Sequence, residues 1–90
     1  MTWKINLSKD AEKFLVKQKI PNDEIFEIVK KSIKKLQGED VNVDLKKLKG
    51  EWLGFFRSRV GKIRVIMKIN FDDFSVFIEK VEYRGSAYKK

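Results

Sequence analysis

Apolar and polar residues alternate near the start of the chain and again through its second half, and they follow a helical period in between. Trp3, Ile5 and Leu7 alternate with Lys4 and Asn6, which is the period of a short half-buried strand. The sequence therefore predicts a strand close to the N-terminus.

Two amphipathic helices are predicted after this strand. The first begins at Ser8, whose hydroxyl can cap the helix, and it ends before Ile20-Pro21, because the residue before a proline disfavours the helical conformation. The second begins near Pro21 or Asn22 and ends at Gly38. Its apolar stripe, which predicts packing on a sheet, consists of Ile25, Val29, Ile33 and Leu36.

The second half of the chain predicts three antiparallel strands. They cover residues 53–60, 63–69 and 74–82, each with apolar residues at every second position. Gly61 occupies the first central position of the first turn, as a two-residue type II′ hairpin prefers. Residues 39–50 precede these strands and are interpreted as a polar connection.

This order of elements predicts an α+β fold. A short N-terminal strand and a two-helix hairpin would pack on an antiparallel sheet with a C-terminal three-stranded meander. Ninety residues are enough for one modest core but not for two, so we expect a single domain over residues 1–90. We expect Phe56, Val65 and Met67 to point toward the helices.

Arginines gather on the other side of the predicted meander. Alternation places Arg57 and Arg59 on one face, with Arg64 on the same side of the next strand. If the turn has two residues, Val60 pairs with Ile63, and Arg59 then pairs directly with Arg64. Opposed like charges destabilise a hairpin by a few tenths to about 1 kcal/mol. Because no acidic residue is interleaved among these arginines in the sequence, the face is interpreted as an anion site. The alternative is a solvated face with splayed arginines.

Further basic and aromatic residues flank this face in the sequence. Arg84 and Tyr88 follow the last predicted strand, and such a tail can fold back over the arginines or simply fray. Tyr88 is suited to stack on a base or to hydrogen-bond a ribose, as aromatic side chains do in RNA sites. Lys46, Lys47 and Lys49 form a cluster that either contacts phosphates without sequence specificity or is a solvated loop.

Composition narrows the chemistry that this chain can perform. The chain holds 21 Lys and Arg against 13 Asp and Glu, a formal net charge of +8 that attracts polyanions. It has no Cys and no His, which removes thiol catalysis, the usual general base and the commonest metal ligand. We therefore expect no cofactor or metal. No apolar run approaches the roughly 20 residues of a membrane helix, and the N-terminus lacks an apolar signal core, so a cytoplasmic location without membrane association is expected.

Three stretches of the sequence resemble one known family. They are Leu-Lys-Lys-Leu-Lys-Gly at 45–50, Arg-Ser-Arg-Val-Gly-Lys-Ile-Arg-Val-Ile at 57–66, and Arg84 with Tyr88. These stretches, and the order of predicted elements over nearly the whole chain, are similar to the RelE/ParE toxin superfamily. The resemblance is strongest to the RelE-like mRNA interferases of prokaryotic toxin–antitoxin systems.

The resemblance implies a ribosome-dependent endoribonuclease that cleaves translated mRNA. The substrate's own 2′-hydroxyl would attack the adjacent phosphate in line without a metal, leaving a 2′,3′-cyclic phosphate and a 5′-hydroxyl. By this resemblance, Arg64 of this chain would clamp the scissile phosphate, Arg84 would assist the leaving oxygen, and Tyr88 would stack on or orient the nucleotide. A cognate antitoxin protein, the ribosome and mRNA are the implied partners.

The same resemblance leaves the general base and two other functions open. Relatives often carry lysines at the positions of Arg57 and Arg59, and arginine is effectively never neutral, so no residue is assigned as the general base. Both arginines stay in the candidate catalytic site beside Arg64. One alternative is a ParE-like toxin that inhibits DNA gyrase. The other is a non-catalytic RNA-binding domain with the same fold.

Overall fold

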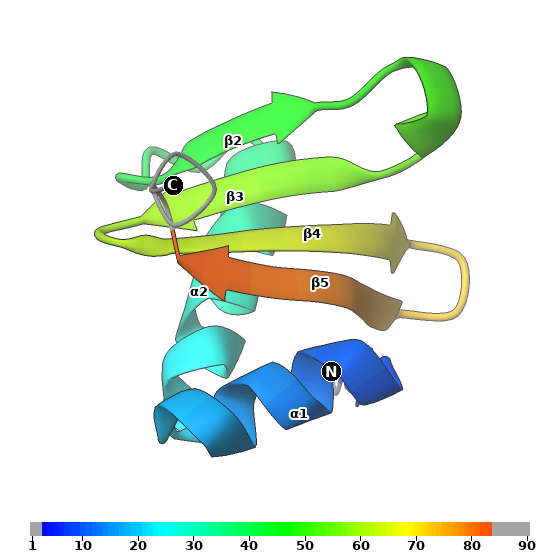
Figure 1. Ribbon diagram of the computed structural model, residues 1–90. Coiled ribbons are helices and arrows are strands. Elements are labelled where there is room, and N and C mark those ends of the chain that lie inside the picture. Colours follow the sequence, from blue (N-terminus) through cyan, green and yellow to red (C-terminus); the bar gives the residue numbers. More distant parts are fainter. Residues whose placement is uncertain (1–2, 84–90) are drawn as a thin grey trace.

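A computed structural model of the chain describes residues 3–83, and these form a five-stranded sheet with two α-helices (Figure 1). The elements follow in the order β1 (Lys4–Leu7), α1 (Lys9–Gln18), α2 (Asn22–Leu36), β2 (Asp44–Lys47), a 3₁₀ helix (Gly50–Trp52), β3 (Phe56–Val60), β4 (Ile63–Asn70) and β5 (Ser75–Tyr83). The predicted α+β class is confirmed.

The sheet is mixed, and its strands lie in the order β1-β5-β4-β3-β2. β3, β4 and β5 form the predicted antiparallel meander. β1 pairs in parallel with β5, and β2 pairs antiparallel with β3. The prediction was therefore wrong in two respects, because the sheet is not wholly antiparallel and residues 39–50 contain a strand. Local periodicity carries no information on pairing direction, and a short charged edge strand resembles a polar loop.

The helix ends are set by local signals, most of which the sequence displayed. Ser8 caps α1 as predicted, since its Oγ accepts a hydrogen bond from the Ala11 backbone N–H at 3.1 Å. The same hydroxyl donates to the Glu79 carbonyl on β5 at 2.7 Å, which fixes the start of α1 against the sheet. α1 ends at Lys19, which has a φ of 57°. Gly38 follows α2 with a φ of 93°, a conformation that glycine adopts without steric cost.

Both helices cover the same face of the sheet. In Figure 1, α2 lies behind the strands and α1 runs along the β5 side. Val65 and Met67 are completely buried, and Phe56 packs against the same core cluster, so the predicted orientation of these strands is confirmed. Leu36, at the end of the predicted stripe, is 37% exposed in the last turn of α2. The helices contribute Ala11, Leu15, Ile25, Ile28, Val29 and Ile33 to this cluster.

The β3–β4 hairpin fixes the register of the arginines. Gly61 has a φ of 60° and the residue after it does not have a positive φ, as a type II′ turn requires. Val60 pairs with Ile63 and Arg59 pairs with Arg64, so both predicted pairings are confirmed. The face of the sheet that carries these arginines is turned away from the helices.

Candidate functional site

The face of the sheet opposite the helices is here called the open face. Residues that pair in register share a face of a sheet, and Arg57, Arg59 and Arg64 all lie on this one. The described residues of strands β2 to β5 that share it are Asp44, Lys46, Arg57, Arg59, Arg64, Ile66, Lys68, Asn70, Ser75, Phe77, Lys80 and Glu82.

One line of residues across the open face places two adjacent arginines between two acidic residues. Asp44, Arg59, Arg64 and Glu82 pair in register from β2 to β5, and we call them the arginine row. Arg59 donates from Nε and Nη2 to Asp44 Oδ2 at 2.9 and 2.6 Å. Arg64 donates from Nη1 to Glu82 Oε2 at 3.2 Å. Each of the two opposed arginines therefore has a carboxylate on its outer side, which offsets their mutual repulsion.

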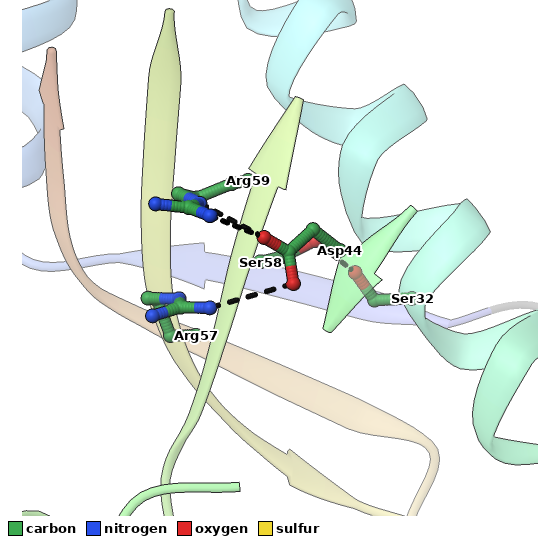
Figure 2. Close-up of polar contacts among 5 residues, drawn as sticks. All are labelled: Ser32, Asp44, Arg57, Ser58 and Arg59. Atoms are coloured by element: carbon green, nitrogen blue, oxygen red, sulfur yellow. Dashed lines mark hydrogen bonds and ion pairs between the residues drawn. The ribbon is translucent and has the colours of Figure 1, made fainter. Parts of the chain in front are cut away.

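Asp44 also contacts the next arginine along β3. Arg57 Nη2 lies 3.4 Å from Asp44 Oδ1, so one carboxylate bridges Arg57 and Arg59 (Figure 2). The hydrogen bond from Arg59 lowers the pKa of Asp44 below its usual value of 3.8, and the charges of Arg59, Arg57 and Lys46 lower it further. Asp44 is therefore ionised at neutral pH, and a carboxylate with a lowered pKa is a weak general base.

The expectation that no acid is interleaved among the arginines is wrong in three dimensions. No acidic residue lies between residues 57 and 64 in the sequence, but Asp44 and Glu82 enter the row from the neighbouring strands. Asp44 was missed because residues 39–50 were interpreted as a connection. The signal for a strand in the sequence was the alternation of polar Asp44, apolar Leu45 and polar Lys46. In the structure, Leu45 is half-buried and its two neighbours are exposed.

A buried polar pair supports β3 from the helix side. Ser58 points away from the arginines toward Ser32 of α2 (Figure 2), and the two Oγ atoms of these fully buried residues lie 2.9 Å apart. The Ser32 hydroxyl also donates to the Ile28 carbonyl at 2.8 Å. Because a hydroxyl carries one proton, Ser58 is then the donor to Ser32. This pair ties α2 to the strand that carries Arg57 and Arg59.

The three lysines of the predicted cluster do not lie together on one surface. Lys46 and Lys47 are consecutive residues of β2 and so face opposite sides: Lys46 pairs with Arg57 on the open face and Lys47 pairs with Phe56. Lys49 caps the 3₁₀ helix beyond the strand. All three are exposed. Of the three, Lys46 is the one that lies among the arginines, and phosphate contact by this cluster stays a prediction.

Arg84 and Tyr88 lie outside the described residues, so their approach to the arginines stays a prediction. Within residues 3–83, no group of three or more His, Cys, Asp or Glu side chains is placed to hold a metal ion. The same residues include no helix that is both long and apolar enough to cross a membrane.

Solved structures of toxins share this fold over nearly the whole chain. The RelBE2 toxin–antitoxin complex from Mycobacterium tuberculosis matches with a TM-score of 0.60 and 25% identity, over 93% of this chain and 100% of that one. The archaeal RelE–RelB complex from Pyrococcus horikoshii OT3 matches with a TM-score of 0.58 and 29% identity, over 96% and 99%. The YoeB–YefM complex from Staphylococcus aureus matches with a TM-score of 0.66 and 21% identity, over 93% and 99%.

The sequence matches no model of a protein family and no curated protein. The fold is a RelE-like α+β fold. The similarity to RelE proteins at 25% and 29% identity supports a RelE-like toxin of a toxin–antitoxin system.

Proposed function

We propose that this chain is a ribosome-dependent endoribonuclease that cleaves translated mRNA in the cytoplasm. The observation that carries the proposal is the gathering of Arg57, Arg59 and Arg64 on one open face, in a fold shared with RelE proteins. Guanidinium groups bind phosphate through two parallel hydrogen bonds and hold their charge at any physiological pH. A face built from them is suited to a phosphate that gains negative charge during reaction.

The reaction needs charge stabilisation more than it needs a cofactor. The 2′-hydroxyl of the substrate loses its proton and forms a bond to the adjacent phosphorus, the bond to the 5′-oxygen breaks, and that oxygen takes up a proton to become a 5′-hydroxyl. The negative charge on the phosphoryl oxygens rises between bond formation and bond cleavage. Arg64 would meet that charge, and its hydrogen bond to Glu82 presets its position. Arg84 would assist the leaving oxygen and Tyr88 would orient the nucleotide, as the family resemblance implies. No residue is assigned as the general base, so in-line positioning on the ribosome would supply much of the rate.

A protein antitoxin belongs to the same proposal. The similar structures from M. tuberculosis and P. horikoshii are complexes of a toxin with its antitoxin. A chain with a net charge of +8 is suited to an antitoxin that brings an acidic segment to the open face and an amphipathic helix beside it. Co-expression with a neighbouring small acidic gene product should give a complex that survives purification. Failure to associate at micromolar concentrations would contradict this part of the proposal.

A reconstituted translation reaction tests the nuclease activity directly. With ribosomes and mRNA present, the protein should produce fragments that begin with a 5′-hydroxyl at positions within the translated region. The same mRNA without ribosomes should stay intact. Intact mRNA in both reactions, under conditions in which the protein blocks gyrase supercoiling, would replace the proposal with the ParE-like function.

A second candidate function is favoured by one specific observation. Arg59 and Arg64 each already hold a carboxylate, and no described residue of the open face is assigned as the general base. A non-catalytic RNA-binding domain requires neither a base nor free arginines. RNA binding without cleavage on ribosomes would establish this second function.

A further inference from the structure

A second part of the open face differs in chemistry from the arginine row. Phe77 on β5 is 40% exposed and pairs in register with Lys68 on β4 and with Asn6 on β1. Solvent-facing positions of a sheet with one covered side are ordinarily polar, and a half-exposed phenyl ring there is not explained by the core. Lys68 lies four residues from Arg64 along β4, which is about 13 Å at the usual strand rise.

A second ring lies on the other side of Lys68. The Lys68 Nζ atom is 5.8 Å from the centre of the Phe55 ring, a cation–π distance. Trp52 packs edge-on against Phe55 with the ring centres 5.2 Å apart, which holds Phe55 in place. Phe55, Lys68 and Phe77 thus form a line of ring, ammonium and ring across the sheet, which we call the aromatic row.

Cations border the aromatic row on the side that faces the arginine row. Between the two rows, Lys46, Arg57, Ile66 and Lys80 lie in register across the sheet. The acids that form ion pairs on the described part of this face, Asp44 and Glu82, both belong to the arginine row. Among the described residues, neither Lys68 nor Lys80 forms an ion pair with a carboxylate. Phosphate oxygens placed over these two lysines would therefore not compete with a carboxylate of the described residues.

We propose that the aromatic row is a base-stacking site for single-stranded RNA, in which one base stacks on Phe77 and the flanking phosphates contact Lys68 and Lys80. This inference rests on the proposed function to the extent that RNA is the substrate. Aromatic rings interleaved with cations are how proteins bind single strands, because every unpaired base offers a flat face while the backbone offers charge. The site would hold the strand about 13 Å from the arginine row, so it selects unpaired RNA without touching the scissile phosphate.

Binding of a fluorescein-labelled oligoadenylate to the full chain, followed by fluorescence anisotropy, tests this site. Phe77→Ala should weaken binding by about 5- to 150-fold, the range found when a ring that stacks on one base is removed. Phe77→Tyr should bind as the wild type does. Phe71→Ala is the matched control, because Phe71 is 42% exposed but lies in the β4–β5 turn against Trp3. It should change the affinity by less than about twofold.

A second probe separates stacking from a general loss of structure. An oligomer of the same length with abasic riboses should bind wild type and Phe77→Ala equally, because it has charge but no base to stack. Equal affinity of Phe77→Ala and wild type for oligoadenylate would overturn the proposal. So would a loss of affinity that is as large for the abasic oligomer. If instead Phe77→Ala keeps its RNA affinity and loses only the antitoxin, the aromatic row is a protein-docking surface and the RNA site is wrong.

These results are independent of cleavage. Stacking on Phe77 without any cleavage on ribosomes would keep the RNA site and remove the nuclease proposal. Cleavage on ribosomes by Phe77→Ala, with unchanged oligoadenylate affinity, would keep the nuclease and remove the RNA site.

Discussion

Asp44 forms ion pairs with two of the three arginines on the open face. It bridges Arg57 and Arg59 from an exposed edge strand, and its lowered pKa keeps it ionised wherever these arginines would meet RNA. A phosphate and this carboxylate compete for the same guanidinium groups. In the proposed function, the bridge would hold both side chains in position before RNA binds, and it would lower the positive charge that RNA meets.

We expect Asp44→Asn to bind RNA more tightly and with a steeper dependence on salt. The substitution releases two arginines toward phosphate, and each added contact to a single strand steepens the slope of log affinity against log salt by about 0.7. Anisotropy titrations with oligoadenylate over a range of KCl concentrations measure this slope. Asp40→Asn is the matched control, because it makes the same charge change at an exposed residue between α2 and β2. Identical slopes for the two variants would show that Asp44 does not compete with phosphate.

The buried serine pair should respond unequally to removal of its two hydroxyls. Ser32→Ala leaves the buried Ser58 hydroxyl without a partner among the described residues, which costs about 1–3 kcal/mol of unfolding free energy. Ser58→Ala leaves Ser32 bonded to the Ile28 carbonyl, so the cost is about 0.5–1.5 kcal/mol. Urea unfolding of both single variants and the double variant measures these values.

In the double variant both polar partners are gone, so its destabilisation should be smaller than the sum of the two single values. A larger loss for Ser58→Ala than for Ser32→Ala would show that the donor is assigned in the wrong direction. A strictly additive double variant would show that the two hydroxyls do not stabilise each other.

At the scale of elements, the helices and strands with a strong local period were predictable from the sequence, and the pairing between distant segments was not. The alternation in β3 to β5 and the stripes of α1 and α2 are long enough to identify each element. The parallel pairing of β1 with β5 joins the two ends of the described chain, and no local pattern encodes it. β2 was not predicted because its four residues, Asp44–Lys47, include only one apolar side chain. The three arginines of the site were therefore predictable, and the carboxylate that bridges two of them was not.

The attachment of β2 to β3 should depend on pH through Asp44. The pKa of Asp44 is 3.8 in the unfolded chain and lower in the folded protein. The ionised carboxylate therefore stabilises the fold at pH values above 3.8. This stabilisation is lost as the pH falls below 3.8 and through the pKa of the folded protein. Wild type should therefore melt at a higher temperature than Asp44→Asn at neutral pH, with the difference shrinking as the pH falls below 3.8. Thermal unfolding followed by circular dichroism measures the difference. A difference that persists unchanged under strong acid would contradict this origin.

At the scale of the whole molecule, the fold separates its core from its charge. The helices and the inward residues of the sheet form one apolar cluster, and the open face carries three arginines and, on strands β2 to β5, three lysines. The net charge of +8 indicated a polyanionic partner, but it could not show which surface would meet it. Strand alternation predicted that the three arginines share one face, the observed register confirms it, and that face is the proposed surface for the polyanion.

The cleavage rate of Arg64→Ala in a reconstituted translation reaction is the most direct test of the proposed nuclease. Removing one preorganised donor from a transferring phosphate should lower this rate by about 100- to 1000-fold. Lys31→Ala is the matched control, because it removes one positive charge from an exposed position on α2, and it should cleave as the wild type does. Thermal unfolding tests whether both variants are folded. Arg64→Lys keeps the charge without the planar guanidinium, so its cleavage rate should lie between those of Arg64→Ala and the wild type. Cleavage by folded Arg64→Ala at the wild-type rate would show that the open face is not where mRNA is cut.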